Sequence, residues 1–315
     1  MKHVVVCGGA GFLGSHLCWK LVKEGYVVTC IDNLSTGTLS NIEALTKMKN
    51  FAFVDMDICN GDWRLIPNGD NVEGIINLAC PASPTDFKTR GQEILLCNSI
   101  GVLWLTKVAR QLGCRFVQAS TSEVYGDPEQ HPQNEKYNGN VSTLSYRAAY
   151  DEGKRFAEAV IATHSSDANP WRPGIVRIFN TYGPNMRPND GRVIPSFVSA
   201  ALKGEALHIN NGGQQTRSFC YVDDLVDGLF RFFQSDLFGP VNIGGIQEIT
   251  IKELAETVVR TCGRGSIIGG HFDEYDPKVR RPDIGLARRS LGWEPTTSLE
   301  QGLEQTIRWF KAVLN

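Results

Sequence analysis

Short apolar runs, many of them β-branched, alternate with longer amphipathic stretches through the first 180 residues of the chain. The apolar runs predict strands over residues 4–7, 27–31, 51–54, 74–78, 116–120 and 174–179. Several of these runs are apolar at consecutive positions, which is typical of strands buried on both faces. Helices between such strands indicate a parallel sheet covered on both sides, the α/β doubly wound fold.

Two helical segments are longer than the others. The first is predicted over 92–111, and the second over 145–164, where small or apolar residues recur every three or four positions. Near residue 180 the sequence becomes rich in turn-forming Asn, Gly and Pro. We therefore predict a domain over 1–180 and a smaller C-terminal α/β substrate-binding domain over 181–315. Its expected helices lie near 192–203, 223–233, 250–261 and 299–313.

Composition excludes several classes of protein. The 315 residues include 32 Lys and Arg against 34 Asp and Glu, a net charge of −2, so no overall positive field favours a nucleic-acid partner. No apolar stretch approaches the roughly 20 residues of a membrane span, and the first strand leaves no room for a signal peptide. The 9 cysteines are scattered without metal-ligand spacing. These features predict a cytoplasmic protein with no metal and no membrane partner.

A glycine-rich loop follows the first predicted strand and opens the first predicted helix. Gly8, Gly11 and Gly14 are three residues apart. Glycines at this spacing allow a tight turn and a close approach of the backbone to a pyrophosphate at the helix N-terminus, as in Rossmann-type domains. The alternative is a glycine turn with a structural role only.

Carboxylates follow the second and third predicted strands. Asp32 comes 18 residues after Gly14, where it can accept hydrogen bonds from an adenosine ribose and would repel a 2′-phosphate, which favours NAD over NADP. Asp57 and Ile58 are placed to bound an adenine. The alternatives are a turn aspartate before Asn33 and an ordinary loop aspartate at residue 57.

A tyrosine and a lysine lie four residues apart in the second long helix. Tyr150 and Lys154 therefore project from one helix face. Because an ammonium stabilises a phenolate, we expect the pKa of Tyr150 to be lowered towards neutrality, making it a base for an alcohol proton. The segment 120–126 ends the fifth predicted strand, so Thr121 and Glu123 fall at the sheet edge where α/β proteins bind ligands.

Together these segments resemble the extended short-chain dehydrogenase/reductases that act on nucleotide sugars. The resemblance covers residues 4–310 and includes segments 77–80, 150–154, 177–184, 217–224 and 280–283. Within that superfamily the sequence is most similar to UDP-glucuronate decarboxylases, through segments 81–84, 121–128, 150–155, 189–193 and 215–217. The resemblance implies NAD-dependent decarboxylation of UDP-glucuronate to UDP-xylose through a 4-keto intermediate, with no net redox change.

The resemblance also implies roles for individual residues. The expected catalytic residues are Thr121, Glu123, Tyr150 and Lys154. The residues expected to bind NAD are Gly8, Gly11, Phe12, Leu13, Gly14, Asp32, Asn33, Ser35, Thr36, Gly37, Asp57, Ile58, Leu78, Ala79, Tyr150 and Lys154. Those expected to bind the UDP-linked sugar are Ser122, Asn180, Arg192, Arg217 and Arg280. A homodimer through the two long helices is expected as well.

Two kinds of alternative stay open. Other nucleotide-sugar enzymes share the first oxidation step with the decarboxylases, and a non-catalytic protein would share only their fold. A nucleotide-sugar 4-epimerase or 4,6-dehydratase would oxidise C4 without releasing carbon dioxide. By resemblance, dehydratases carry an acid where this chain has Ser122, and simple 4-epimerases lack a carboxylate at Glu123. A non-catalytic NAD-binding module would be expected to lose Tyr150 or Lys154. One departure from the decarboxylases is Leu96, where the family usually has a lysine that reaches towards cofactor or substrate.

Overall fold

A parallel sheet forms the centre of the protein. The computed structural model describes residues 2–66, 71–164, 171–272 and 276–314. Its 7-stranded sheet has the order β11-β6-β5-β4-β1-β2-β3, and every pairing is parallel. The strands are β1 (His3–Cys7), β2 (Val27–Asp32), β3 (Phe51–Asp55), β4 (Val72–Asn77), β5 (Arg115–Thr121), β6 (Arg172–Ile178) and β11 (Val241–Ile243). The predicted doubly wound fold is confirmed.

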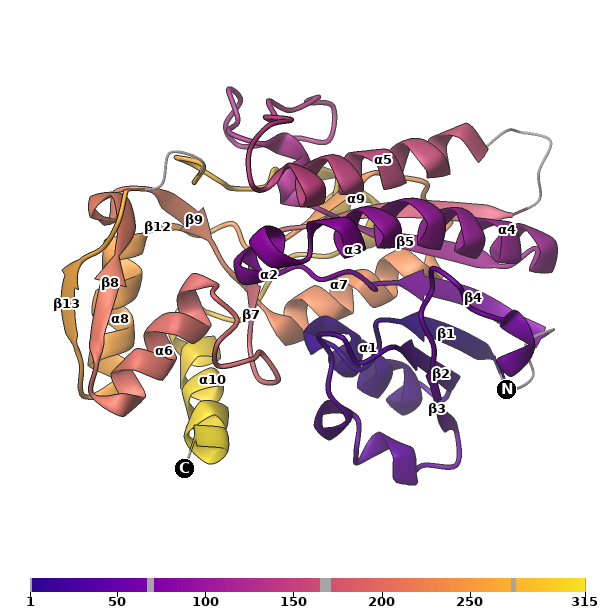
Figure 1. Ribbon diagram of the computed structural model, residues 1–315, viewed down its shortest axis with the longest axis horizontal. Helices are drawn as coiled ribbons and strands as arrows, with labels where there is room; N and C mark the ends of the chain where they lie inside the picture. Colours follow the sequence, from indigo (N-terminus) through magenta and orange to yellow (C-terminus); the bar gives the residue numbers. More distant parts are fainter. Residues whose placement is uncertain (1, 67–70, 165–170, 273–275, 315) are drawn as a thin grey trace.

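Helices cover both faces of the sheet (Figure 1). On one face lie α3 (Gly91–Leu96), the π-helical turn η5 (Cys97–Gly101), α4 (Val102–Leu112) and α5 (Ala148–His164). On the other lie α1 (Phe12–Lys23) and α7 (Val222–Gln234). The core divides accordingly: Val4 and Val6 pack with the residues of α1 and α7, whereas Val5 packs with those of α4 and α5. Both faces of β1 are buried, which explains its continuous apolar run.

The predicted elements differ from the observed ones mainly at helix ends. The segment predicted as one helix over 92–111 contains the π-helical turn of η5 between α3 and α4. The second long helix begins at Ala148 rather than at residue 145, because residues 146–147 form a turn. The short helix α2 (Pro84–Thr89), capped by the Ser83 side chain, was not predicted.

The C-terminal part forms a second lobe beside the carboxyl ends of the strands (Figure 1). Its helices are α6 (Val193–Lys203), α8 (Ile251–Cys262) and α10 (Leu299–Leu314), whereas α9 (Gly285–Leu291) packs on β11 and α7. Three two-stranded sheets pair β7 (Thr181–Tyr182) with β10 (Cys220–Tyr221), β8 (Ala206–Ile209) with β13 (Ser266–Gly269), and β9 (Thr216–Ser218) with β12 (Glu248–Thr250). Because α7 and β11 follow residue 180 yet belong to the central sheet and its cover, the two parts interleave in space.

Candidate active site

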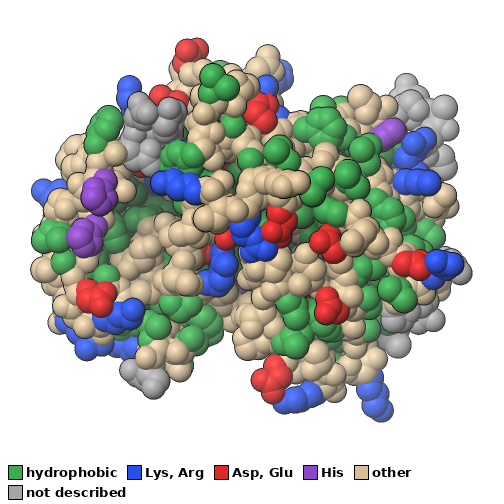
Figure 2. All heavy atoms as spheres, viewed as in Figure 1, with side chains coloured by type: hydrophobic (Ala, Val, Ile, Leu, Met, Phe, Trp, Pro, Cys, Tyr) green, Lys and Arg blue, Asp and Glu red, His purple; other side chains and the backbone are tan. Residues whose placement is uncertain are grey.

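A cavity of about 730 Å³ runs along the carboxyl ends of the strands and into the second lobe. It includes the point between β1 and β4 at which the strand order reverses, where ligands of open α/β sheets bind. Every residue predicted for the site lies in its wall except Gly37. The space-filling view shows charged side chains gathered between the two lobes (Figure 2).

The glycine loop leaves no room for side chains. Gly8 has a φ of +76°, and a Cβ on it would lie 2.7 Å from the backbone nitrogen of Ala79. A Cβ on Gly14 would lie 2.0 Å from the carbonyl oxygen of Gly8. The loop therefore brings bare backbone and the N-terminus of α1 to the cavity wall, which fits the pyrophosphate of a dinucleotide.

Two carboxylates are fixed at the ends of β2 and β3. Asp32 accepts hydrogen bonds from the backbone nitrogens of Ala10 at 3.0 Å and Leu34 at 2.8 Å. Burial raises its pKa, while these amides act in the opposite direction. A Cβ on Gly37 would lie 3.0 Å from both Asp32 carboxylate oxygens, so Gly37 keeps this space clear without lining the cavity. Asp57 accepts from the Asn33 amide at 3.0 Å.

Tyr150 and Lys154 project from α5 into the cavity, as their spacing predicted. The Tyr150 ring stacks on Phe87 with centroids 4.7 Å apart. Lys154 Nζ donates to the carbonyl oxygen of Ala119 at 2.9 Å and lies 5.8 Å from the Tyr150 ring centroid. The expected lowering of the Tyr150 pKa is wrong for the protein alone: burial raises this pKa and outweighs the hydrogen bond with Thr121.

Glu123 is held between two guanidinium groups. Arg147 Nη2 lies 2.5 Å from Glu123 Oε2, and Arg280 Nη1 pairs with Glu123 Oε1. Burial by itself would raise the pKa of Glu123, but the positive charges of Arg147 and Arg280 lower it to about 2. Thr121 begins the turn that carries Glu123, whose backbone nitrogen donates to the Thr121 hydroxyl at 3.2 Å.

Arg147 is the functional candidate that sequence reasoning missed. It precedes Tyr150 by three residues, and it is 8 % exposed. Within the helix predicted over 145–164, this spacing puts Arg147 on the same face as Tyr150, which is the signal that could have identified it. Arg280, predicted for the substrate, lies in the wall beside Glu123 and also donates to the Gly126 carbonyl oxygen at 3.0 Å.

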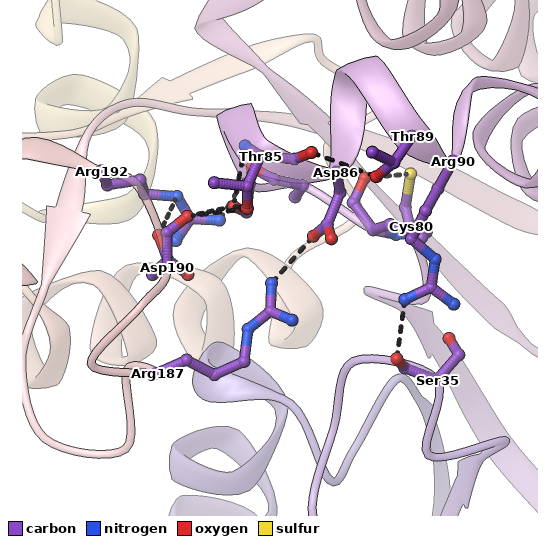
Figure 3. Close-up of polar contacts among 12 residues, drawn as sticks. Ser35, Cys80, Thr85, Asp86, Thr89, Arg90, Arg187, Asp190 and Arg192 are labelled. Carbon is purple, nitrogen blue, oxygen red and sulfur yellow. Dashed lines mark hydrogen bonds and ion pairs between the residues drawn. The ribbon is translucent and has the colours of Figure 1, made fainter.

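The remaining arginines of the wall come from the second lobe. Arg217 is paired with Asp276 at 2.5 Å. Arg192 donates to the carbonyl oxygen of Ala82 at 2.8 Å. Figure 3 shows this region, including the ion pair at 2.8 Å between Arg187 and Asp86 of α2. The helix α2 therefore links the two lobes at the rim of the cavity. Ser122 and Asn180 complete the predicted wall.

Leu96 does not line the cavity. Its side chain is 37 % exposed on the outer side of α3, whereas the next residue, Cys97, does reach the wall. At this position the chain therefore supplies no positive charge to the cavity wall.

Within 2–66, 71–164, 171–272 and 276–314, no group of three or more His, Cys, Asp or Glu side chains is arranged to hold a metal ion. None of the helices found in these same ranges combines the length and the apolar character that a membrane crossing requires.

A glycine loop that fits a pyrophosphate, joined by one cavity to a tyrosine and lysine pair, defines a dinucleotide-dependent enzyme. The sequence model of the NAD dependent epimerase/dehydratase family matches residues 4–244. The chain belongs to this family.

Named relatives are similar along almost the whole chain. UDP-glucuronic acid decarboxylase 1 of Xenopus tropicalis is 42% identical over 314 residues, covering 99% of this chain and 73% of the relative. UDP-glucuronic acid decarboxylase 5 of Arabidopsis thaliana is 44% identical over 303 residues, covering 95% of this chain and 86% of the relative. The UDP-glucuronic acid 4-epimerase of Bacillus cereus, solved with UDP-glucuronic acid and NAD, superimposes with a TM-score of 0.90 at 27% identity, covering 99% of this chain and 100% of that one.

Proposed function

We propose that this protein is a UDP-glucuronate decarboxylase that uses NAD to convert UDP-glucuronate into UDP-xylose and carbon dioxide. The relatives with 42% and 44% identity carry that activity in their names. The observation in the structure that supports it most directly is the Glu123, Arg147 and Arg280 cluster beside Tyr150, because it places charge at the end of the cavity where the sugar would react.

Tyr150 is the proposed base and acid at the sugar 4-hydroxyl. When bound, NAD supplies the acceptor, and later the donor, of the hydrogen at C4. Tyr150 takes the hydroxyl proton as C4 is oxidised and returns it when C4 is reduced, with Thr121 hydrogen-bonded to the same reacting oxygen. Its pKa in the protein alone is raised by burial, so ionisation of Tyr150 must rely on Lys154 and on the positively charged cofactor ring.

Carbon dioxide leaves after the oxidation because the substrate carboxylate is then β to a ketone. The electrons of the broken carbon–carbon bond pass into the C4 carbonyl as an enolate, which nearby hydrogen-bond donors stabilise. The two guanidiniums of Arg147 and Arg280 face one ionised Glu123, so this group carries a surplus of positive charge when Asp151 is neutral. That surplus suits a substrate with an acidic sugar.

The diphosphate requires donors nearer the second lobe. We assign it to Arg217 and Arg192, with Asn180 as a hydrogen-bond donor, since all three line the cavity. Arg280 is assigned to the sugar end instead, because its guanidinium is engaged with Glu123. The division into an NAD-binding part over 1–180 and a nucleotide-sugar-binding part over 181–315 remains part of this proposal.

The experiment is NMR of the purified protein with UDP-glucuronate and NAD, following the anomeric signals and released carbon dioxide. Formation of UDP-xylose with carbon dioxide is the expected result, and Tyr150→Phe should lower kcat by roughly 10²- to 10⁴-fold. Tyr137→Phe, outside the cavity wall, is the matched control. Conversion to the galacturonate epimer, or no reaction, would reject the decarboxylase.

A homodimer and a cytoplasmic location are also proposed. Exposed apolar side chains gather on the outer side of α3, η5, α4 and α5: Leu95, Leu96, Ile100, Leu103 and Phe156, each 37 to 49 % exposed. Figure 2 shows apolar side chains over the part of the surface where Figure 1 places α4 and α5. Such a patch suits an isologous contact with a second copy. The 9 cysteines, all free thiols, support a reducing compartment.

A further inference from the structure

One buried carboxyl beside the site has no part in the chemistry described above. Asp151 follows Tyr150 in α5, is 5 % exposed, and lies outside the wall of the large cavity. Its Oδ1 has no hydrogen-bond partner among the residues that the structure describes, and its Oδ2 lies 3.9 Å from Arg147 Nε. A buried carboxyl so placed is stable in its protonated form, because ionisation would leave a charge poorly compensated.

Asp151 lines a second, smaller cavity that leads to the surface. This side cavity of about 90 Å³ is bounded by Asp151, Glu123 and Arg147 on the inside. Its outer wall includes Asn140 and Ser142, which are exposed. Glu123 and Arg147 also line the large cavity, so they form the partition between the two. A space of this size, with the side chains of Asp151, Glu123 and Arg147 in its wall, can hold a short chain of waters.

The proposed reaction consumes a proton that Tyr150 does not supply. Loss of carbon dioxide from the sugar carboxylate breaks the C5–C6 bond and leaves an enolate, which becomes a ketone when C5 gains a proton. Tyr150 takes the O4 proton at oxidation and returns that same proton to O4 at reduction. One further proton per turnover must therefore come from solvent and reach C5.

We propose that Asp151 and the side cavity form the inlet for this proton, with Asp151 holding it and Glu123 passing it to C5. The inference rests on the proposed decarboxylase function. Glu123 lines the large cavity and faces the substrate. Asp151 does not line that cavity and acts through Glu123, so it is a positioning residue. Each transfer moves one proton inward from Asp151 to Glu123 and then to C5, and surface water reloads Asp151.

The charges around Asp151 suit this role. Burial raises its pKa to about 7; Glu123 and Glu152 act in the same direction, and Arg147 and Arg280 oppose them. Asp151 is thus partly loaded at neutral pH, whereas Glu123, with a pKa of about 2, is not. Transfer from Asp151 to Glu123 is therefore uphill in the protein alone, because the two guanidiniums favour the ionised form of Glu123.

The test compares Asp151→Asn with Glu152→Gln. The asparagine keeps the shape of the side chain but holds no acidic proton, and the control removes the neighbouring carboxylate, whose side chain is 38 % exposed and paired with Arg155. With UDP-glucuronate and NAD, Asp151→Asn should lower kcat by about 10- to 100-fold with KM within about 3-fold of wild type. Reduced cofactor should accumulate, because the enolate cannot be reduced at C4 until C5 is protonated. Glu152→Gln should keep kcat within about 2-fold of wild type, because its carboxylate contributes less to the raised pKa of Asp151 than burial and Glu123 do.

A second readout does not depend on turnover. The infrared band of a protonated carboxyl should disappear between about pH 6 and pH 8 in the wild-type protein and be absent from Asp151→Asn. The kcat of the wild-type protein should fall over the same pH range, and the kcat of Asp151→Asn should not show this fall. A normal kcat for Asp151→Asn in an active enzyme, or an effect on KM alone, would overturn the proton inlet only. Failure of the wild-type protein to release carbon dioxide would reject the proposed function, and with it the inference that depends on it.

Discussion

The unusual state of Asp151 has a consequence for folding stability that is independent of the enzyme's substrate. Its pKa is about 7 in the folded protein, against 3.8 for an aspartate in water, mainly because burial disfavours the charged form. A carboxyl whose pKa is raised on folding binds its proton more tightly in the folded state. Stability is therefore lost as pH rises from the unfolded pKa towards the folded one.

The size of this loss of stability follows from the folded and unfolded pKa values of Asp151. Between about pH 5 and pH 7 the unfolded chain has released this proton and the folded protein has not, so each pH unit removes about 1.4 kcal/mol. Asn at position 151 does not titrate. The free energy of unfolding of Asp151→Asn relative to wild type should therefore rise by about 3 kcal/mol from pH 5 to pH 8, whatever its offset at pH 5.

Urea unfolding followed by far-ultraviolet circular dichroism at several pH values measures this difference. Glu152→Gln is the control, because it removes a carboxylate from the same helix turn that is 38 % exposed and paired with Arg155. Its difference from wild type should stay within about 0.5 kcal/mol across the range. A constant difference for Asp151→Asn from pH 5 to pH 8 would show that the folded-state pKa of Asp151 is ordinary, and the burial argument would be wrong.

Other predictions concern the loop, the core and the surface. Gly14→Ala should abolish NAD binding in calorimetry, because its Cβ would lie 2.0 Å from the Gly8 carbonyl oxygen. Arg115→Met should lower the free energy of unfolding by about 3 kcal/mol in urea titrations, since the buried guanidinium donates to the carbonyl oxygens of Pro173 and Leu237, each at 2.8 Å. Leu103→Glu should convert the proposed dimer into a monomer in light scattering, because it places a charge in the exposed apolar patch; an unchanged mass would reject that interface.

The parts of the fold that sequence reasoning predicted well depend on local patterns. Continuous apolar runs identified β1, β2, β4, β5 and β6 because both faces of those strands are largely buried, and they identified β3 although that edge strand is mostly half-buried. The glycine loop was found because the close approach of Gly14 to Gly8 occurs within seven residues of sequence. The strand β11 was missed, since three residues carry little periodicity and its place beside β6 depends on the return of the chain after α7.

The site was predicted less completely because its electrostatics arise from distant contacts. Arg280 meets Glu123 across 157 positions of sequence, and no local pattern announces that pairing. The spacing of Tyr150 and Lys154 correctly placed them in one cavity but could not show that Tyr150 is only 7 % exposed, which determines the direction of its pKa shift. Burial is a property of the whole fold, so residue types and spacing alone do not give it.

The cluster at the sugar end also limits how its variants should be interpreted. Glu123, Arg147 and Arg280 are buried or nearly so, and both guanidiniums pair with the one carboxylate of Glu123. Removal of Glu123 alone would leave two buried guanidiniums without their carboxylate, a cost of roughly 3 to 5 kcal/mol in comparable buried pairs. A loss of activity in Glu123→Gln would therefore mix lost proton transfer with a disturbed cluster. Asp151 lies one step further from the substrate, and its ion pair with Arg147 is long, at 3.9 Å, so its substitution separates the movement of the proton from the integrity of the site.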